Sequence, residues 1–209
     1  AEEKVEIEKE LSVVVARNKK GEIKCYPVVE MIFDPKANLA DMIICPASVG
    51  SEQSEEAIYL AGRIIELLNM EGVLAVEFFV NRNGEVVVNE MAPRTHNSGH
   101  HTIESVLTSH FEQQLRAVLN LPLGSTQLKL PAVMINIVGD EDHEGPVRYE
   151  GLEEILAIEG AHLHLYGKKI TRPYRKMGHI TVLSESPASA LEKAKRVKQL
   201  IGVKSWKKS

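Results

Sequence analysis

Two glutamates in separate apolar segments are the residues whose spacing first suggests chemistry. Glu77 lies in Ala-Val-Glu-Phe-Phe and Glu90 in Val-Val-Asn-Glu-Met, and Asn83-Gly84 between them is a strong hairpin signal. If Asn83 and Gly84 are the two central turn residues, Arg82 pairs with Glu85, and Glu77 faces Glu90 across an antiparallel ladder. Like charges at that spacing are unfavourable, and unpaired carboxylates among apolar residues are costly, unless a cation binds both.

The ligand types at this position favour a hard cation. Carboxylate oxygens without Cys or His ligands suit Mg²⁺ that also binds substrate phosphates, and Asn89 adds a neutral oxygen on the same strand. The alternative is a solvent-facing hairpin edge, where both charges are hydrated and Arg82 or another cation lies nearby. The pairing alone leaves both alternatives open. The predicted metal ligands are Glu77 and Glu90.

The loop that follows Glu90 carries groups that could bind and react with an anion. It reads Ala-Pro-Arg-Thr-His-Asn-Ser-Gly-His-His over residues 92–101. Arg94 offers a guanidinium fork, His96 a proton carrier near neutral pH, and Asn97 an amide donor. A polar connection whose Pro and Gly serve only backbone geometry is the commoner case for such a segment alone. Zinc at His96 and His100 is disfavoured, because the loop has no Cys and adjoins carboxylates.

A basic segment lies near the carboxyl end. Residues 160–184 contain no acidic side chain, in a protein whose net charge is −4. Such a local positive patch suits a phosphate, and Pro173 and Gly178 make the segment loop-like, so that several cations could converge. The alternative is a solvated basic face. The candidate cations are Lys168, Lys169, Arg172, Arg175 and Lys176.

The elements that must position these residues follow from periodicity, caps and turn residues. A helix capped by Ser51 is expected to continue until Gly72 stops it. A second helix opens with a capping box at Ser109 and is expected to turn Phe111, Leu115 and Val118 inward. Strands are predicted at residues 11–16, 23–32, 42–45, 73–80 and 86–91. Further on, the pattern predicts a strand at 132–138, a short helix at 152–156, strands around Leu163 and Ile180, and a helix from Ser186-Pro187 to Gly202.

Composition excludes several classes of protein. The 209 residues are 44% apolar, which allows a full core. A pI near 6.1 gives no reason to expect nucleic acid as a partner. No apolar run approaches the roughly 18 residues of a membrane helix, and no signal peptide opens the chain. Cys25 and Cys45 lack metal spacing, so we expect them to be reduced and buried in a cytoplasmic protein.

The periodic pattern is interrupted near residues 122–131, which predicts one domain at 1–125 and a smaller one at 126–209. The chain starts without Met and reads as strand almost at once, so we expect a fragment of a longer protein.

The motifs around both glutamates resemble the 5-(carboxyamino)imidazole ribonucleotide synthases of the ATP-grasp superfamily. The Glu and Asn-Glu strand pair is common to ATP-grasp enzymes, whereas Ala-Pro-Arg-x-His-Asn-Ser-Gly-His is much narrower. The resemblance continues through Met134-Ile135-Asn136 to Tyr-Gly-Lys and Arg-Pro-x-Arg-Lys-Met-Gly-His, and so covers nearly the whole chain. It implies an α+β fold, with an antiparallel ATP-grasp sheet and packed helices followed by a small mixed α/β carboxyl-terminal domain.

The resemblance implies an ATP-dependent ligase of purine synthesis that forms a carbon–nitrogen bond. Such an enzyme makes carboxyphosphate from ATP and bicarbonate and carboxylates 5-aminoimidazole ribonucleotide, with Mg²⁺ bound and as a homodimer at full length. Rival enzymes are other ATP-grasp carboxylases or ligases, such as biotin carboxylase or a glycinamide ribonucleotide synthetase. A rival of another class is a non-catalytic fragment that binds a phosphorylated ligand.

The resemblance also assigns roles to residues. Arg94 would hold bicarbonate or carboxyphosphate, and His96 would manage a proton, with Asn97 and Lys168 also at the catalytic site. Phe33 stands where the family usually has His, so that nucleotide contact is lost or supplied differently. No Gly-rich phosphate loop precedes the adenine hinge, so we expect the chain alone to turn over ATP negligibly. The implied ribonucleotide-phosphate residues are Lys168, Arg172, Arg175 and Lys176. The implied ATP residues are Glu2, Glu3 and Val5 at the adenine hinge, Glu10 at the ribose, and Asn89 and Glu90.

Overall fold

A computed structural model describes residues 4–36 and 39–206 of the chain. They form two compact units: the first contains the residues up to Ile32 together with Ile43–Leu130, and the second contains Phe33–Met42 and Pro131–Ser209. The predicted division into domains 1–125 and 126–209 stays a prediction. No helix in the described ranges is long and apolar enough to cross a membrane.

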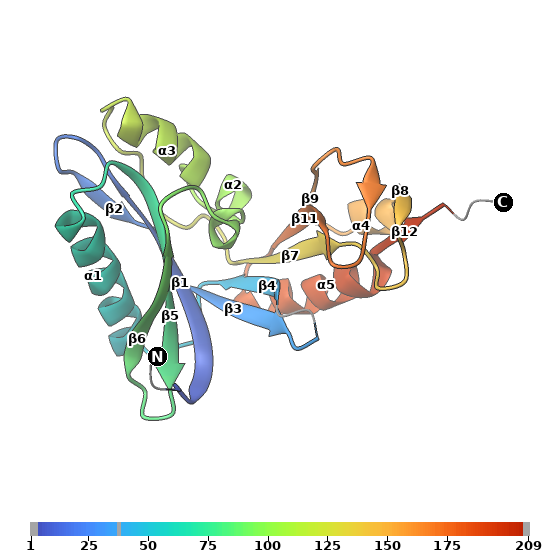
Figure 1. Ribbon diagram of the computed structural model, residues 1–209, viewed down its shortest axis with the longest axis horizontal. Coiled ribbons are helices and arrows are strands. Elements are labelled where there is room, and N and C mark those ends of the chain that lie inside the picture. The colour runs from blue at the N-terminus through green and yellow to red at the C-terminus, as the bar shows by residue number, and fades with distance from the viewer. Residues whose placement is uncertain (1–3, 37–38, 207–209) are drawn as a thin grey trace. The chain divides into compact units, whose positions relative to one another are not determined.

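The first unit is built on an antiparallel sheet with a helix on each face (Figure 1). Its strands run in the order β6-β5-β1-β3, and β2 pairs with the end of β1. Helix α1 packs on one face and α3 on the other. The bounds are β1 Ile7–Arg17, β2 Ile23–Cys25, β3 Val29–Asp34, β4 Leu39–Cys45, α1 Ser51–Leu67, β5 Gly72–Asn81, β6 Val86–Ala92, the 3-10 helix η1 Asn97–Gly99, α2 Thr102–Ser105 and α3 His110–Val118.

Strand β1 is apolar on both faces because both faces are covered. Leu11 and Val13 belong to the core on the α1 side, whereas Val14 and Ala16 belong to the core on the α3 side. Alternate residues of a strand point to opposite faces, so a strand that is covered twice reads as a continuous apolar run. Ser12 interrupts this run and is fully buried.

The predicted strand at 23–32 is two strands in the structure. β2 pairs with the end of β1, and β3 pairs with its beginning, for example Glu10 with Met31. Tyr26 lies between them, and its hydroxyl donates a hydrogen bond to the backbone oxygen of Thr108 (2.9 Å). Pro27 in this break lacks a backbone donor for a ladder, which explains why pairing stops there.

The helix boundaries differ slightly from those expected. Gly50, not Ser51, is the N-cap of α1, and its backbone N–H donates to the side chain of Gln53 (2.9 Å). The helix ends at Leu67, because the chain turns into the left-handed region at Asn69 (φ 46°) before it reaches Gly72.

Helix α3 has the predicted cap but not the predicted inward face. The hydroxyl of Ser109 accepts a hydrogen bond from the backbone N–H of Glu112 (3.2 Å). The apolar residues expected to face inward are 40–60% exposed, whereas His110, Gln113 and Ala117 are buried. Gln113 is held by two hydrogen bonds with the backbone of Gly124 (2.8 and 3.0 Å), which satisfies a polar side chain inside the unit. The prediction for Phe111, Leu115 and Val118 is therefore wrong.

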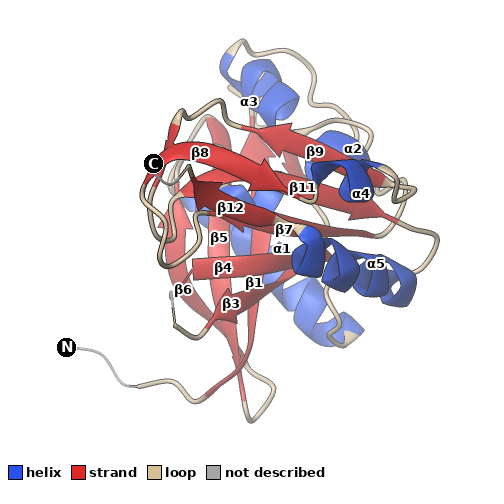
Figure 2. Ribbon diagram, turned by 90° about the vertical axis from the view of Figure 1, so that its right-hand side faces the viewer, coloured by secondary structure: helices blue, strands red, loops and turns tan. Residues whose placement is uncertain are grey.

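The described strands of the second unit belong to two sheets, and its described residues form the helices α4 and α5 (Figure 2). In one sheet β4, β7, β11 and β9 are neighbours in that order, and α5 packs against β7 and β11. The other sheet has the order β10-β8-β12, and its short strands were not predicted. The bounds are β7 Ala132–Val138, β8 Gly145–Glu150, α4 Leu152–Leu156, β9 Ala161–Leu165, β10 Ile170–Thr171, β11 Lys176–Leu183, α5 Pro187–Leu200 and β12 Gly202–Ser205. Ser186 caps α5 as predicted, and the predicted α+β fold class is confirmed.

We predict that Phe78→Ala destabilises the chain by about 3 to 5 kcal/mol, because a fully buried aromatic ring between β5 and α1 leaves a cavity when it is removed. Urea denaturation gives the free energy of unfolding from the midpoint at an unchanged slope. Phe111→Ala is the matched control and should cost about 1 kcal/mol or less, since Phe111 is 40% exposed. Equal losses for the two variants would show that α3 buries its apolar face after all.

Candidate functional site

The hairpin between β5 and β6 turns through three residues rather than two. The backbone N–H of Asn81 donates to the oxygen of Glu85 (3.1 Å), and Gly84 has a left-handed φ of 82°. The side chain of Asn81 also accepts hydrogen bonds from the backbone N–H groups of Asn83 and Glu85 (2.9 and 3.0 Å), so the turn begins one residue earlier than Asn83-Gly84 indicates. The predicted pairing of Arg82 with Glu85 is wrong.

A β-bulge then changes the register beside Glu77. Phe78 pairs with Val88, but the next pair is Val76 with Met91. Between these pairs β5 has Glu77 alone, whereas β6 has both Asn89 and Glu90, which is the two-against-one count of a bulge. In place of the expected one-to-one pair, Glu77 lies opposite Asn89 and Glu90 together.

The bulge brings three oxygen-bearing side chains to one face of the sheet. The pairs Phe79–Val87 and Ala75–Ala92 define the face that carries Glu77, because residues two apart share a face. Counting along β6 from Val87 assigns Asn89 to this face, and counting back from Ala92 assigns Glu90 to it as well. Without the extra residue only one of the two could lie there.

This donor set fits a hard cation. Glu77 is 8% exposed and Glu90 is exposed, so one carboxylate is fixed in the sheet and the other is open to a ligand. Within the described residues no three His, Cys, Asp or Glu side chains gather as a metal-ligand cluster. Two carboxylates with a neutral oxygen are the partial ligand set that Mg²⁺ uses when phosphates and water complete its shell.

His96 lies against Glu77. Its Nε2 is 3.6 Å from Glu77 Oε1, and both side chains are more than four-fifths buried. Its Nδ1 is 3.0 Å from the hydroxyl of Ser98, which is 2.9 Å from the hydroxyl of Ser12. Ser12 is in turn the strand partner of Glu77. The structure thus brings the predicted carboxylate and histidine together and adds two serines that the sequence had not indicated as a pair.

Other predicted residues of this unit lie around the same sheet. Arg94 is exposed, and its guanidinium donates to the backbone oxygen of Thr95 (3.0 Å), while Asn97 opens η1. Glu10 is half-buried on β1 as the partner of Phe79, and burial raises the pKa of its carboxyl. Glu2 and Glu3 lie outside the described residues.

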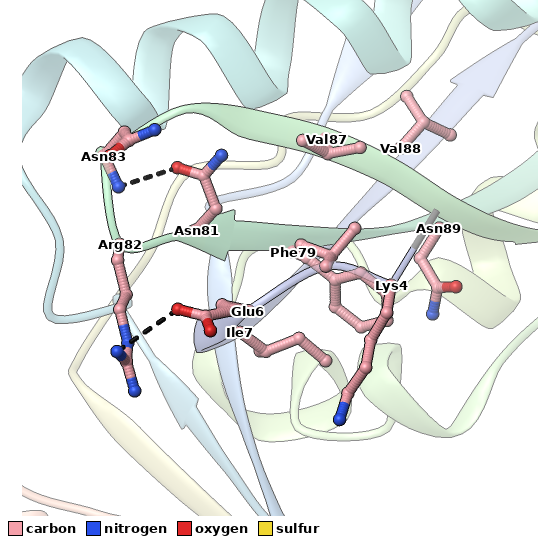
Figure 3. A pocket seen from close by; sticks show the side chains of 11 residues that line it. Lys4, Glu6, Ile7, Phe79, Asn81, Arg82, Asn83, Val87, Val88 and Asn89 are labelled. Carbon is pink, nitrogen blue, oxygen red and sulfur yellow. Dashed lines mark hydrogen bonds and ion pairs between the residues drawn. The ribbon is translucent and has the colours of Figure 1, made fainter. Parts of the chain in front are cut away.

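An open pocket of about 840 Å³ lies beside the hairpin (Figure 3). Lys4 to Ile7 form one wall, and the ends of β5 and β6 form the other. Figure 3 shows Asn89 beside Phe79 and Lys4, and Glu6 paired with Arg82 (3.2 Å). Val5 and Asn89 of the predicted ATP site line this pocket, whereas Glu77 and Glu90 are not among its described lining residues.

Two buried histidines, one at the end of the loop and one in α3, are held by hydrogen bonds, and neither was among the predicted site residues. His101 Nδ1 is 2.7 Å from the hydroxyl of Ser105, and His110 Nδ1 is 3.0 Å from the hydroxyl of Thr102. Burial, followed by the charge of His100, lowers the pKa of His101 and of His110 to about 3. Their neutral rings are therefore part of the packing that fixes the loop.

The basic segment of the second unit brings its cations together. Lys168 donates to the backbone oxygen of Lys176 (2.5 Å), and Arg175 donates to that of Ile170 (2.9 Å). The pKa of Lys168 is lowered by burial and then by the charges of Arg175 and Arg172, so both arginines are close enough to repel the Lys168 ammonium. Such repulsion is relieved when an anion binds among them.

Tyr166 and His179 lie next to this cluster and were not predicted. The Tyr166 hydroxyl is 3.0 Å from Nδ1 of the buried His179, whose ring stacks on His164 at 4.4 Å. The ammonium of Lys168 is 5.7 Å from the centre of the Tyr166 ring. The alternation His162-x-His164-x-Tyr166, which extends from β9 to the residue just after it, was the available signal. Phe33, at the position where the family usually has His, is half-buried in β3 of the sheet.

Comparison with known proteins decides the family. Residues 1–111, more than half of the chain, match the family model of the ATP-grasp domain. The chain belongs to the ATP-grasp family. Residues 132–193, which lie in the second unit, match the family model of the phosphoribosylaminoimidazole carboxylase C-terminal domain.

Similar proteins confirm the resemblance seen in the motifs. The N5-carboxyaminoimidazole ribonucleotide synthase of Aquifex aeolicus is 41% identical over 96% of this chain and 52% of its own length. The chloroplastic phosphoribosylaminoimidazole carboxylase of Vigna aconitifolia is 44% identical over 87% of the chain and 32% of its own length. The crystal structure of N5-carboxyaminoimidazole ribonucleotide synthetase from Thermotoga maritima has a TM-score of 0.93 and 54% identity, over 98% of this chain and 55% of that one. The chain thus spans a third to about half of these relatives.

We predict that the chain loses stability as pH falls below about 6.5, because unfolded His101 and His110 take up protons there while the folded rings resist them down to about pH 3. Each such histidine contributes a loss of about 1 kcal/mol between pH 7.5 and 5.5. Urea midpoints at both pH values measure the loss for the native chain.

The matched comparison for this loss is His110→Gln against His143→Gln, which alters a half-buried histidine of the second unit. His110→Gln should make the free energy of unfolding less dependent on pH, and His143→Gln should not. The same pH dependence in the native chain and in His110→Gln would contradict the prediction.

Proposed function

We propose that the chain carries the metal, nucleotide and ribonucleotide-phosphate residues of an ATP-dependent ligase that carboxylates 5-aminoimidazole ribonucleotide with bicarbonate. The observation that carries this proposal is the bulge, which gathers Glu77, Asn89 and Glu90 on one face. A relative from Aspergillus clavatus, 32% identical with a TM-score of 0.85, was crystallised with ADP and 5-aminoimidazole ribonucleotide. That complex supports the choice of both substrates.

In the first unit the proposed roles follow the chemistry of the side chains. Glu77 and Glu90 would hold Mg²⁺, with Asn89 as a further oxygen; such an ion offsets charge on ATP phosphates during phosphoryl transfer. Val5 and the neighbouring backbone would bind adenine beside the open pocket, and Glu10 would accept hydrogen bonds from ribose hydroxyls. Glu2 and Glu3 remain proposed hinge residues.

The loop after β6 would bind the one-carbon substrate. Arg94 is exposed and presents a planar pair of donors that matches bicarbonate or carboxyphosphate. Asn97 would add an amide donor, and His96 of the same loop lies against Glu77. ATP would transfer its terminal phosphoryl group to bicarbonate, and the amine of the ribonucleotide would then take the carboxyl group and release phosphate.

The second unit would bind the phosphate of the ribonucleotide. Arg172 and Arg175 both repel Lys168, so an anion among these cations would gain from three charges, and Lys176 starts the adjoining strand. The match of this unit to the phosphoribosylaminoimidazole carboxylase C-terminal domain favours this ligase over biotin carboxylase or a glycinamide ribonucleotide synthetase. Cytoplasmic location and a homodimer remain part of the proposal.

The experiment that tests the function replaces the matched segment of the Thermotoga maritima synthetase with this chain. We expect ATP consumption that requires both bicarbonate and 5-aminoimidazole ribonucleotide. A well-folded chimera that consumes ATP with neither requirement, or with another acceptor, would contradict the proposal. The chain alone should hydrolyse ATP negligibly by the same assay.

We predict that Glu77→Gln and Glu90→Gln in this chimera each raise the Mg²⁺ concentration needed for half-maximal activity at least tenfold. Each variant removes a charged oxygen from the proposed ligand set. Activity is measured against Mg²⁺ concentration, and calorimetry of Mg²⁺ binding in the presence of ATP provides a second readout. Glu71→Gln, at an exposed carboxylate just before β5, is the control. Unchanged Mg²⁺ dependence in both variants would remove the metal assignment.

We predict that Lys168→Ala or Arg175→Ala weakens ribonucleotide binding about tenfold to more than a hundredfold, because a lost charge-assisted phosphate contact costs roughly 1.5 to 3 kcal/mol. The measurement varies the ribonucleotide at saturating ATP and bicarbonate. Lys169→Ala removes an exposed cation from the same segment and should have no effect beyond about twofold. If all three variants behaved alike, general charge and not this cluster would explain the binding.

A further inference from the structure

A row of four polar side chains links β1, the loop and β5. Ser12 and Ser98 are 0% and 1% exposed, and their hydroxyls are 2.9 Å apart. The Ser98 hydroxyl is 3.0 Å from Nδ1 of His96, and Nε2 of the same ring is 3.6 Å from Glu77 Oε1. Because Ser12 and Glu77 are partners on adjacent strands, the two ends of the row are fixed by one sheet.

The contacts at Nδ1 fix which nitrogen of the neutral ring carries hydrogen. The backbone N–H of Ser98 donates to Nδ1 (3.4 Å), which makes the His96 ring the cap of η1. A backbone amide can donate and cannot accept, so Nδ1 has to present its lone pair. The hydrogen of the neutral ring is therefore on Nε2.

The hydroxyl groups complete the same pattern. With Nδ1 as an acceptor, the Ser98 hydroxyl donates to it, and the Ser12 hydroxyl donates to Ser98. Each buried hydroxyl then has a partner, as burial requires. Ser12 stands in an otherwise apolar run of β1, where a hydroxyl without such a partner would be costly.

The other edge of the ring selects the same tautomer. Nε2 faces a carboxylate oxygen, and an N–H directed at a carboxylate is attractive, whereas a lone pair directed at it is repulsive. Ser98 on one side of the ring and Glu77 on the other thus both favour hydrogen on Nε2. The separation of 3.6 Å is slightly longer than a hydrogen bond, and a small movement of the carboxylate would close it.

We propose that Ser98 and Ser12 are positioning residues that hold the His96 ring in its Nε2–H tautomer, so that His96 orients the carboxylate of Glu77. Carboxylates that bind metal ions are commonly hydrogen-bonded by such neighbouring groups. His96 then acts on the ligand carboxylate, in place of the proton-carrying role that the loop motif implied. The effect on Mg²⁺ rests on the proposed function, whereas the tautomer does not.

The first test is a nitrogen-15 spectrum of histidine-labelled chain, recorded above the pH range in which histidine protonates and assigned with His96→Gln. We expect the His96 ring to show hydrogen on Nε2 alone. In Ser98→Ala the Nδ1 signal should move and the second tautomer should appear, and Ser98→Thr should restore the native pattern. Ser12→Ala should move the same signal in the same direction by a smaller amount.

The matched control is Ser105→Ala, which removes a buried hydroxyl from a different histidine, His101. It should change the signals of His101 and leave those of His96 in place. Hydrogen on Nδ1 of His96 in the native chain would overturn the proposal without any variant. So would unchanged His96 signals in folded Ser98→Ala.

The second test follows Mg²⁺ in the chimera. Ser98→Ala should raise the Mg²⁺ concentration needed for half-maximal activity by about ten- to a hundredfold, leave the KM for the ribonucleotide unchanged, and be rescued by Ser98→Thr. A loss confined to the KM for the ribonucleotide would overturn the link to Glu77. Failure of the native chimera as a carboxylating ligase, with the tautomer as expected, would refute the proposed function and leave the positioning of His96 intact.

Discussion

A carboxylate that is buried inside a strand is the constraint around which the first unit is arranged. Glu77 lies between the fully buried Val76 and Phe78, and an ionised group there needs polar partners. Three segments supply polar groups around it: the bulged part of β6, the loop through His96, and β1 through Ser12. An even ladder would place either Asn89 or Glu90 on the opposite face, so the irregularity of β6 is what gathers oxygen-bearing side chains beside Glu77.

The hairpin shows how far local sequence predicts this arrangement. Alternation and the Asn-Gly pair correctly predicted two antiparallel strands with Glu77 and Glu90 near one another. The predicted register at the turn was wrong because the side chain of Asn81 accepts hydrogen bonds from the turn backbone, which makes the turn begin one residue earlier. The bulge was not predictable either, since its extra residue has no local signature in Val-Asn-Glu-Met. The turn shifts the pairing by one residue and the bulge shifts it back, so the two errors cancelled beyond Glu77.

Elsewhere the errors have a common physical cause. Hydrophobic periodicity predicted that Phe111 faces inward. Instead α3 buries His110 and Gln113, which form hydrogen bonds with Thr102 and Gly124 outside the helix. Periodicity measures apolar character and contains no information about hydrogen-bond partners. The convergence of Lys168 and Arg175 was predictable because the segment lacks acids, whereas Tyr166 and His179 become relevant only through pairing of β9 with β11.

The chemical role of His96 depends on a residue far away in the sequence. The loop motif supplies an imidazole, and an imidazole can carry a proton or direct an N–H, depending on what each nitrogen contacts. Nδ1 contacts the hydroxyl of Ser98, which is hydrogen-bonded to Ser12 of β1. The fold, and not the loop motif, therefore specifies which nitrogen of the ring is the donor. A ring fixed in this way resists transfer of its hydrogen from Nε2 to Nδ1, because the backbone N–H of Ser98 that donates to Nδ1 cannot become an acceptor. The same contacts that anchor the loop to the sheet therefore restrict His96 to presenting its N–H toward Glu77.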